Sequence, residues 1–308
     1  MSPSVDEHLE TALKEYNERV NALESSGSDA ELLDAYINRG CVLSMMDYYV
    51  AAISDFDDAV EIINHLEARG VEIDAGTYVK TYISRGEIRG GDDLRPMADD
   101  YAMAATRLSK LNDHSKYFDH KKIIMTCISC VEDLVDENFP AEVDPFLNKA
   151  WSMLIGKEDS WSRNRYLELL NLKGQAEVDL LATDNAMESF SDAIDVGREL
   201  LERAGLDDMM SLVFAFVSRG DIEQEKGIIE SYIIDRKAAI TLLEQLLEVN
   251  KLDDVQVLAQ LHQDLANTYL TLNKVKEAEE HLMREVMLNV DGARDYIREY
   301  ADRPIVPK

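Results

Sequence analysis

The chain has 308 residues, of which 61 are Asp or Glu and 32 are Lys or Arg, so its net charge is −29. A field of this sign repels phosphate backbones and anionic membrane surfaces, which argues against nucleic-acid and membrane partners. Hydrophobic residues make up 46% of the chain, and only 6 Pro and 14 Gly interrupt it. This composition excludes a disordered chain and favours helices.

The N-terminal segment predicts an amphipathic helix rather than a secretory signal. An acidic pair, Asp6 and Glu7, lies where a signal peptide would carry a basic stretch. Residues 5–25 place one apolar face along a helix, formed by Leu9, Ala12, Leu13, Tyr16 and Val20. We expect residues 1–27 to cap one end of the fold.

From about residue 30 onward, one pattern recurs along the chain. Each copy has a small anchor residue, and the steps between anchors are 46, 44, 44, 46 and 46 residues: Gly40, Gly86, Cys130, Gly174, Gly220 and Ala266. An aromatic residue follows the first four anchors after 15 or 16 residues: Phe56, Tyr101, Phe146 and Phe190. Self-similarity at a fixed period predicts a repeat architecture.

These offsets resemble the tetratricopeptide repeat, in which helix A carries an aromatic and a small residue and helix B carries Ala, an aromatic and Ala. The last copy, from Leu265 to Ala278, is the plainest match. The resemblance covers residues from about 30 to 288, with units longer than the usual length of about 34 residues. It implies an all-α fold, a right-handed α-solenoid of about six helix-turn-helix repeats with capping helices.

The expected domain organisation follows from the anchors. We expect the repeat array at residues 28–290, with a degenerate third repeat at about 117–156. Pro140 and Pro145 interrupt that third copy, and we expect a bend or break near Pro140. Residues 291–308 predict a short C-terminal capping helix and a tail.

No set of residues in the chain has the pattern of a catalytic site. Cys127 and Cys130 have redox or metal spacing, but they lie in an apolar run and are expected in the core. His114 and His120 stand without a zinc motif such as His-Glu-x-x-His. We therefore expect no catalytic, cofactor-binding or metal-binding residues and no cofactor. Three cysteines cannot form a disulfide framework, so we expect a cytoplasmic protein.

A charge pairing recurs between the two helices of three repeats. An Arg before the anchor is matched by an Asp near the aromatic position: Arg39 with Asp55, Arg85 with Asp100, and Arg219 with Asp235. In the fourth copy both partners change, to Lys173 and Ser189. We expect an ion pair from helix A to helix B in each of the three repeats. The fifth copy departs in another way, since Arg236 takes its aromatic position.

The resemblance also implies a binding groove on the concave face, lined by helix A of each repeat. The repeat register gives these candidates: Asp34, Ile37, Cys41, Lys80, Ile83, Glu87, Glu168, Asn171, Gln175, Phe214, Val217, Asp221, Gln260, Gln263 and Asn267. Amides can bond the backbone of an extended peptide, and they cluster in the C-terminal half. We expect the main contact there, with acidic side chains selecting Lys or Arg.

The favoured hypothesis is a non-catalytic scaffold that binds a protein or peptide with basic patches. The net acidity serves solubility equally well in principle. One alternative is a self-assembling module that associates through Trp151, Trp161, Tyr48 and Tyr49. Another is a sensor or regulatory arm that acts on a separate enzyme or transcription factor. No nucleic acid and no membrane are expected as partners, and the chain is expected to be a monomer or a homodimer.

Overall fold

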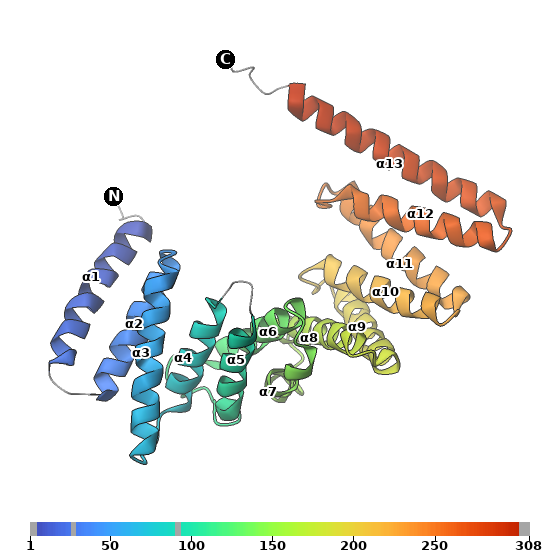
Figure 1. Cartoon of the computed structure of the whole chain (residues 1–308). Helices are drawn as coiled ribbons and strands as arrows, with labels where there is room; N and C mark the ends of the chain where they lie inside the picture. Colours follow the sequence, from blue (N-terminus) through green and yellow to red (C-terminus); the bar gives the residue numbers. More distant parts are fainter. Residues whose placement is uncertain (1–4, 26–28, 90–93, 302–308) are drawn as a thin grey trace. The chain divides into compact units, whose positions relative to one another are not determined.

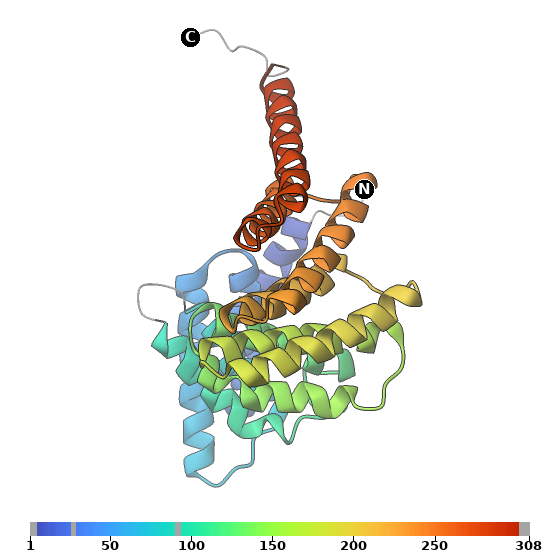
Figure 2. The same ribbon diagram turned by 90° about the vertical axis from the view of Figure 1, so that its right-hand side faces the viewer.

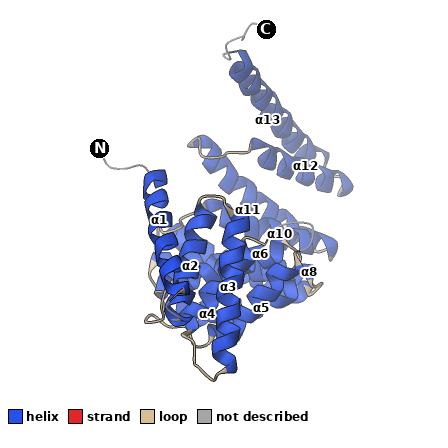
Figure 3. Ribbon diagram, turned by 60° about the vertical axis from the view of Figure 1, so that its left-hand side comes forward, coloured by secondary structure: helices blue, strands red, loops and turns tan. Residues whose placement is uncertain are grey.

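The computed structural model describes three stretches of the chain, with side chains up to residue 289: residues 5–25, 29–89 and 94–301. In these stretches the chain forms helices joined by turns and loops (Figure 3). It divides into two compact units, Met1–Gly156 and Lys157–Lys308. In both units, helices that follow each other in the chain pack as pairs (Figure 1).

In the residues that the structure describes, the N-terminal unit contains one leading helix and three helix pairs, α2 with α3, α4 with α5, and α6 with α7. The leading helix α1 packs on α2. Their bounds are α1 Val5–Glu24, α2 Asp29–Met45, α3 Tyr49–Ala68, α4 Ala75–Glu87, α5 Arg95–Leu108, α6 His120–Asp136, the 3-10 turn η1 Pro140–Glu142, and α7 Asp144–Leu154.

In its described part the C-terminal unit contains three pairs, and each of the six predicted anchors of the chain lies in the first helix of its pair. The bounds are α8 Ser160–Asp179, α9 Thr183–Glu202, α10 Met209–Glu225, α11 Ile229–Glu248, α12 Val255–Thr271 and α13 Val275–Ala301. The predicted all-α fold with six helix-turn-helix repeats is confirmed.

The chain divides into its two units after Gly156, at the end of the degenerate third repeat, and Pro140 begins the short turn η1 inside the first unit. The bend expected near Pro140 stays a prediction, whereas the expected C-terminal helix differs. Residues 291–301 continue α13 and do not form a separate helix. Parts of the predicted caps and tail lie outside the described residues, namely 1–4, 26–28 and 302–308.

Local sequence signals explain where each helix A begins. From the second repeat onward, an Asp side chain accepts a hydrogen bond from a backbone N–H two or three residues later: Asp74 from Thr77, Asp119 from Lys122, Asp159 from Ser162, Asp208 from Met210 and Asp254 from Gln256. These distances lie between 2.8 and 3.0 Å. Each Asp satisfies an N–H that the helix leaves without a partner, and its charge complements the helix dipole.

The anchor glycines allow helix A and helix B to approach closely. A Cβ atom added to Gly174 would lie 2.6 Å from the ring of Phe190, and one added to Gly86 would lie 2.6 Å from the ring of Tyr101. Atoms at that separation overlap, so only glycine fits while the aromatic ring stays in place. The recurring pair of a glycine and an aromatic residue therefore records a physical contact.

The three predicted ion pairs are confirmed, and each is bidentate. Arg39 donates to Asp55 at 2.6 and 2.8 Å. Arg85 donates to Asp100 at 2.5 and 3.0 Å, and Arg219 donates to Asp235 at 2.7 Å through both nitrogens, so each pair ties helix A to helix B.

The fourth repeat replaces this ion pair with a different contact. Glu177 accepts a hydrogen bond from Ser189 at 2.6 Å and pairs with Lys173 at 3.4 Å. The connection between the two helices is kept although both original partners have changed.

Candidate functional site

The fifth repeat departs from the close glycine–aromatic packing of the first, second and fourth repeats. Its aromatic side chain is Tyr232, one helical turn before the expected position, and Tyr232 is fully buried. A Cβ atom on Gly220 would meet nothing closer than 3.6 Å, so the contact that is tight at Gly174 is relaxed here. Arg236 then takes the position that Phe190 has in the fourth repeat.

Arg236 is almost completely buried, with 3% of its surface exposed. Its guanidinium donates to the carboxylate of Asp221 and, at 3.3 Å, to the backbone carbonyl of Val217 on α10. The ring of Tyr232 lies 5.0 Å below the guanidinium carbon. A buried cation needs such compensation, because desolvation is costly for an unpaired charge. The fifth repeat thus has a buried ion pair, Arg236 with Asp221, where the fourth repeat has the apolar contact of Phe190 with Gly174.

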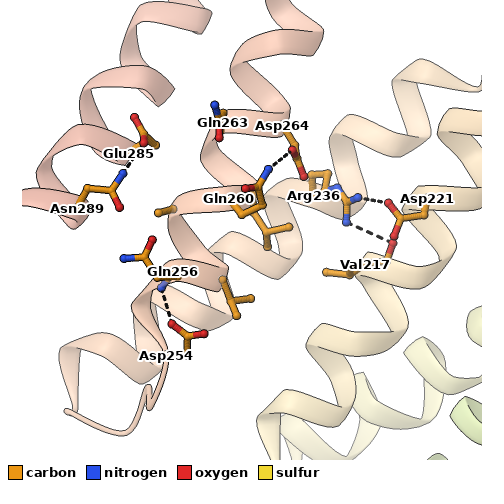
Figure 4. Close-up of a pocket in the computed structure, with 13 residues that line it drawn as sticks. Val217, Asp221, Arg236, Asp254, Gln256, Gln260, Gln263, Asp264, Glu285 and Asn289 are labelled. Carbon is orange, nitrogen blue, oxygen red and sulfur yellow. Dashed lines mark hydrogen bonds and ion pairs between the residues drawn. The ribbon is translucent and has the colours of Figure 1, made fainter. Parts of the chain in front are cut away.

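Arg236 and Asp221 line a groove of about 550 Å³ between residues of α10, α11, α12 and α13 (Figure 4). Its charged side chains are four carboxylates and one guanidinium: Asp221, Asp254, Asp264, Glu285 and Arg236. Four amide side chains line it as well: Gln256, Gln260, Gln263 and Asn289. We call this the acidic groove. It carries a net charge of −3, which is four negative charges less one positive charge.

A second hollow of about 270 Å³ adjoins the acidic groove and shares Asp221, Arg236 and Asp264 with it. It adds the side chains of Asn267 and Thr268 from α12. Together the two hollows offer carboxylates for cations and amides for the backbone of a bound chain.

The electrostatics of the acidic groove centre on Asp221. Desolvation by its surroundings raises the pKa of Asp221, and the neighbouring Asp264 acts in the same direction. The Arg236 guanidinium opposes this shift by its charge and its hydrogen bond. A second cation placed near Asp221 and Asp264 would relieve their mutual repulsion.

The structure brings five of the predicted groove residues together. Asp221, Val217, Gln260 and Gln263 line the acidic groove, and Asn267 lines the adjoining hollow. They all come from the fifth and sixth repeats, where the amides were expected to form the main contact. Their role in binding stays a prediction.

Three other candidates are buried, so their assignment to a groove surface is wrong. Ile37 is 0% and Ile83 2% exposed, because both side chains pack in the core. Asn171 is 7% exposed and donates to the carbonyl of Ser211 at 2.9 Å, which ties α8 to the next helix A.

Asp34 is partly exposed, but the chain itself already uses its carboxylate. The loop at residues 109–119 crosses to α2, where the Lys116 ammonium and the Tyr117 hydroxyl both contact Asp34, the hydroxyl at 2.9 Å. The loop also packs tightly on α4, since a Cβ atom on Gly76 would lie 2.0 Å from the carbonyl oxygen of Lys116. These two contacts would therefore compete with a partner for the Asp34 carboxylate.

None of the remaining candidates lines the acidic groove or the adjoining hollow. Three of them have neighbours within their own unit: Glu168 pairs with Arg165 at 2.9 Å, Gln175 donates to Asp179 at 3.1 Å, and Phe214 stacks edge-on against Phe190 at 6.0 Å. The other three, Cys41, Lys80 and Glu87, form a cluster on α2 and α4. Burial raises the pKa of Glu87, and the charge of Lys80 opposes that shift.

Sequence reasoning missed six charged or amide residues of the acidic groove: Arg236, Asp254, Gln256, Asp264, Glu285 and Asn289. One signal could have found the site, since an Arg at an aromatic position breaks the repeat. A charged side chain in a core slot requires a partner, and the search for that partner leads to Asp221.

The two closely spaced cysteines are core residues, as expected. Cys127 and Cys130 are each 1% exposed, and burial raises the pKa of the Cys127 thiol to about 12. Across the described residues, no group of three or more His, Cys, Asp or Glu side chains has an arrangement that could hold a metal ion.

No protein-family model and no curated protein sequence matches the chain. Among solved structures, the apo form of RapI aligns over 91% of this chain and 76% of its own, with a TM-score of 0.57 and 12% identity. Aspartyl phosphate phosphatase F from Bacillus subtilis aligns over 95% of this chain and 77% of its own, with a TM-score of 0.53 and 13% identity. At such identities the likeness concerns the fold. The chain has a tetratricopeptide-like helical repeat fold. Within the described stretches, no helix is long and apolar enough to cross a membrane.

Proposed function

We propose that this chain is a non-catalytic binding protein whose acidic groove holds a basic, extended segment of another protein. The observation that carries the proposal is the lining of the groove, where four carboxylates and four amides share one hollow with a single buried guanidinium. Carboxylates bind Lys and Arg side chains, and amides can bond an extended backbone as both donor and acceptor.

The net charge of −29 supports the same preference at longer range, because it attracts basic partners and speeds their encounter. The three cysteines are free thiols, which supports a cytoplasmic location. One solved structure of this fold is named as a phosphatase, but the likeness extends to the fold only, and we propose no catalytic step for this chain.

The test uses two fluorescent peptides, one of alternating Lys and Ala and one of alternating Glu and Ala. We expect saturable binding of the Lys peptide at low salt. The double variant Asp221→Asn/Asp264→Asn should bind it at least about tenfold more weakly, since two partly enclosed carboxylates are lost. Fluorescence anisotropy measures the affinities.

The matched control is Glu10→Gln/Glu18→Gln, which removes the same charge from two exposed positions on α1. If both double variants weaken binding equally, the attraction belongs to the overall field and the acidic groove is not the site. The pH dependence adds a second readout: because the pKa of Asp221 is raised, binding should weaken at a higher pH than an ordinary Asp would cause.

Self-assembly stays an alternative function, with Tyr48 and Tyr49 exposed at 55% and 48%. Sedimentation of the full chain over a range of concentrations tests it. A monomer at all concentrations would count against it.

A further inference from the structure

The last helix, α13, carries an exposed apolar stripe. Its members lie on one side of the helix, and between 37% and 64% of each is exposed: Val275, Leu282, Met283, Val286 and Met287. In the views of Figures 1 and 2, α13 lies beside α12, and no other helix of the C-terminal unit covers its far side. None of these five residues lines the acidic groove.

Comparison with the other repeats shows that this side of a helix B is normally covered. Val286 lies 20 residues after its anchor, Ala266, and is 55% exposed. The residues at the same position in three other repeats are 9%, 0% and 5% exposed: Val60, Ile194 and Ile240. The three helices that carry them, α3, α9 and α11, each pack against helix A of the following repeat.

One of these contacts shows how close the covering helix comes. A Cβ atom on Gly197 of α9 would lie 2.7 Å from the Leu212 side chain of α10. Helix α10, which packs on this side of α9, thus presents a large apolar side chain to it. The apolar stripe on α13 offers the same kind of surface without the helix.

Helix α1 presents a different outer side from α13. Helix α1 packs on α2 and turns Leu9, Leu13 and Val20 toward it, while its outer side is polar except for Val5. A polar outer side is what a repeat array needs at an end that faces water. An apolar stripe at an end is instead the mark of an interaction surface.

The charges beside the stripe select the kind of occupant. Glu279 and Glu280 are exposed on this side of α13 together with Lys276, and the neighbouring Arg284 is already paired with Glu244 at 3.3 Å. A second copy of this chain would bring like charges together here. A helix with basic flanks would be attracted instead.

We propose that the apolar stripe of α13 docks an amphipathic helix of a partner protein, with an apolar face and Lys or Arg flanks, in the place of a seventh helix A. In this mode of recognition the apolar face of the partner helix lies on the stripe, with contact residues spaced three and four apart. It is independent of the acidic groove, which takes an extended segment.

The test measures binding of three synthetic peptides of 18 residues to the full chain by fluorescence anisotropy. The first has Leu at helical spacing and Lys at its polar positions, the second has Glu in place of Lys, and the third is a scrambled form of the first. We expect the first to bind at least about tenfold more tightly than the other two, because only it offers both the apolar face and the charge. Equal binding of the scrambled peptide would overturn the proposal.

The decisive variant is Met283→Glu/Met287→Glu, with Met45→Glu/Val50→Glu as its matched control at positions that are 70% and 87% exposed. Both variants add two negative charges, so general attraction of a Lys peptide rises equally. We expect loss of binding only in the α13 variant and unchanged thermal stability in both. Met287→Gln provides a milder variant and should weaken binding in the same direction.

Two results would contradict the proposal. Undiminished binding to Met283→Glu/Met287→Glu would place the peptide elsewhere. A wild-type dimer in sedimentation that becomes a monomer in this variant would show that a second copy covers the stripe. Failure at the acidic groove would leave these outcomes unaffected, since Asp221→Asn/Asp264→Asn should bind the helical peptide normally.

Discussion

The fourth and fifth repeats have the same length and the same helix pairing, but they solve one packing problem in opposite ways. In the fourth repeat, Phe190 lies against Gly174 and closes the space between the helices. In the fifth, Tyr232 fills the core one turn earlier and Arg236 occupies the aromatic position. Arg236 reaches Asp221, the residue that corresponds to Gln175 of the fourth repeat.

The difference shows how a repeat protein can create a site without changing its backbone plan. Exchanging an aromatic for a cation removes one apolar contact and requires a carboxylate nearby. The exchange places the charged Arg236 in the lining of the acidic groove, while the ion pair of Arg219 and Asp235 still ties the two helices together. Four predictions test this comparison.

The largest effect is expected for Arg219→Ala. It leaves Asp235, which is 1% exposed, without its bidentate partner, so the free energy of unfolding should fall by about 3–5 kcal/mol. Lys173→Ala in the fourth repeat removes a half-exposed ammonium and should cost less than about 1 kcal/mol. Urea unfolding of both variants measures the difference, and equal losses would contradict the distinction between the two repeats.

The anchor glycines should respond in opposite directions. Gly174→Ala forces a methyl group against Phe190 and should destabilise the protein by about 1–3 kcal/mol. The methyl group added by Gly220→Ala would lie at ordinary contact distances from its neighbours. The better helix propensity of Ala should therefore stabilise the protein by up to about 1 kcal/mol. Thermal and urea unfolding give the sign for each variant. A loss at Gly220 equal to that at Gly174 would show that the fifth repeat is packed as tightly as the fourth.

The double variant Tyr232→Ala/Arg236→Phe gives the fifth repeat the side chains of the fourth. In this background we expect Gly220→Ala to become destabilising, with a coupling of about 1–2 kcal/mol between the glycine and the new aromatic ring. A double-mutant cycle in urea measures that coupling. Additive effects would mean that the aromatic position does not control the anchor.

The sixth repeat differs from the fifth by a titratable histidine in its core. His262 stands where the fifth repeat has Phe216, and its Nδ1 lies 2.8 Å from Nδ1 of His281. Burial, aided by the charges of His281 and Arg284, lowers the pKa of His262 to about 4. A lowered histidine pKa favours the neutral form in the fold, so stability is complete above the unfolded pKa and is lost as the pH falls below it.

Lowering the pH from 7.5 to 5.5 should reduce the free energy of unfolding of the wild type by about 1 kcal/mol through His262. This figure assumes a pKa of about 6.5 for His262 in the unfolded chain. His262→Phe restores the residue of the fifth repeat and should remove that part of the pH dependence. The measurement is the difference in unfolding free energy at the two pH values. An identical pH dependence in wild type and variant would mean that His262 does not titrate in this range.

Much of the architecture could be predicted because it rests on local and periodic signals. The anchors at Gly40, Gly174 and Gly220 and the partners of Arg39 and Arg219 follow one register, and the structure confirms the pairs. The groove surface was less predictable. Register alone cannot separate a helix A residue that faces solvent from one that faces the core, which is why Ile37 and Asn171 were misplaced.

Composition, period and spacing by themselves determined the six helix pairs and the three ion pairs, since both depend on residues at nearly fixed offsets within one repeat. Only the tertiary structure decided which parts of those helices stay open. It brings Lys116 to Asp34 across 82 residues, gathers the residues of the acidic groove from two repeats and leaves Val286 uncovered. The physical reason is that exposure depends on what packs from outside a repeat, and a repeat's own pattern does not carry that information.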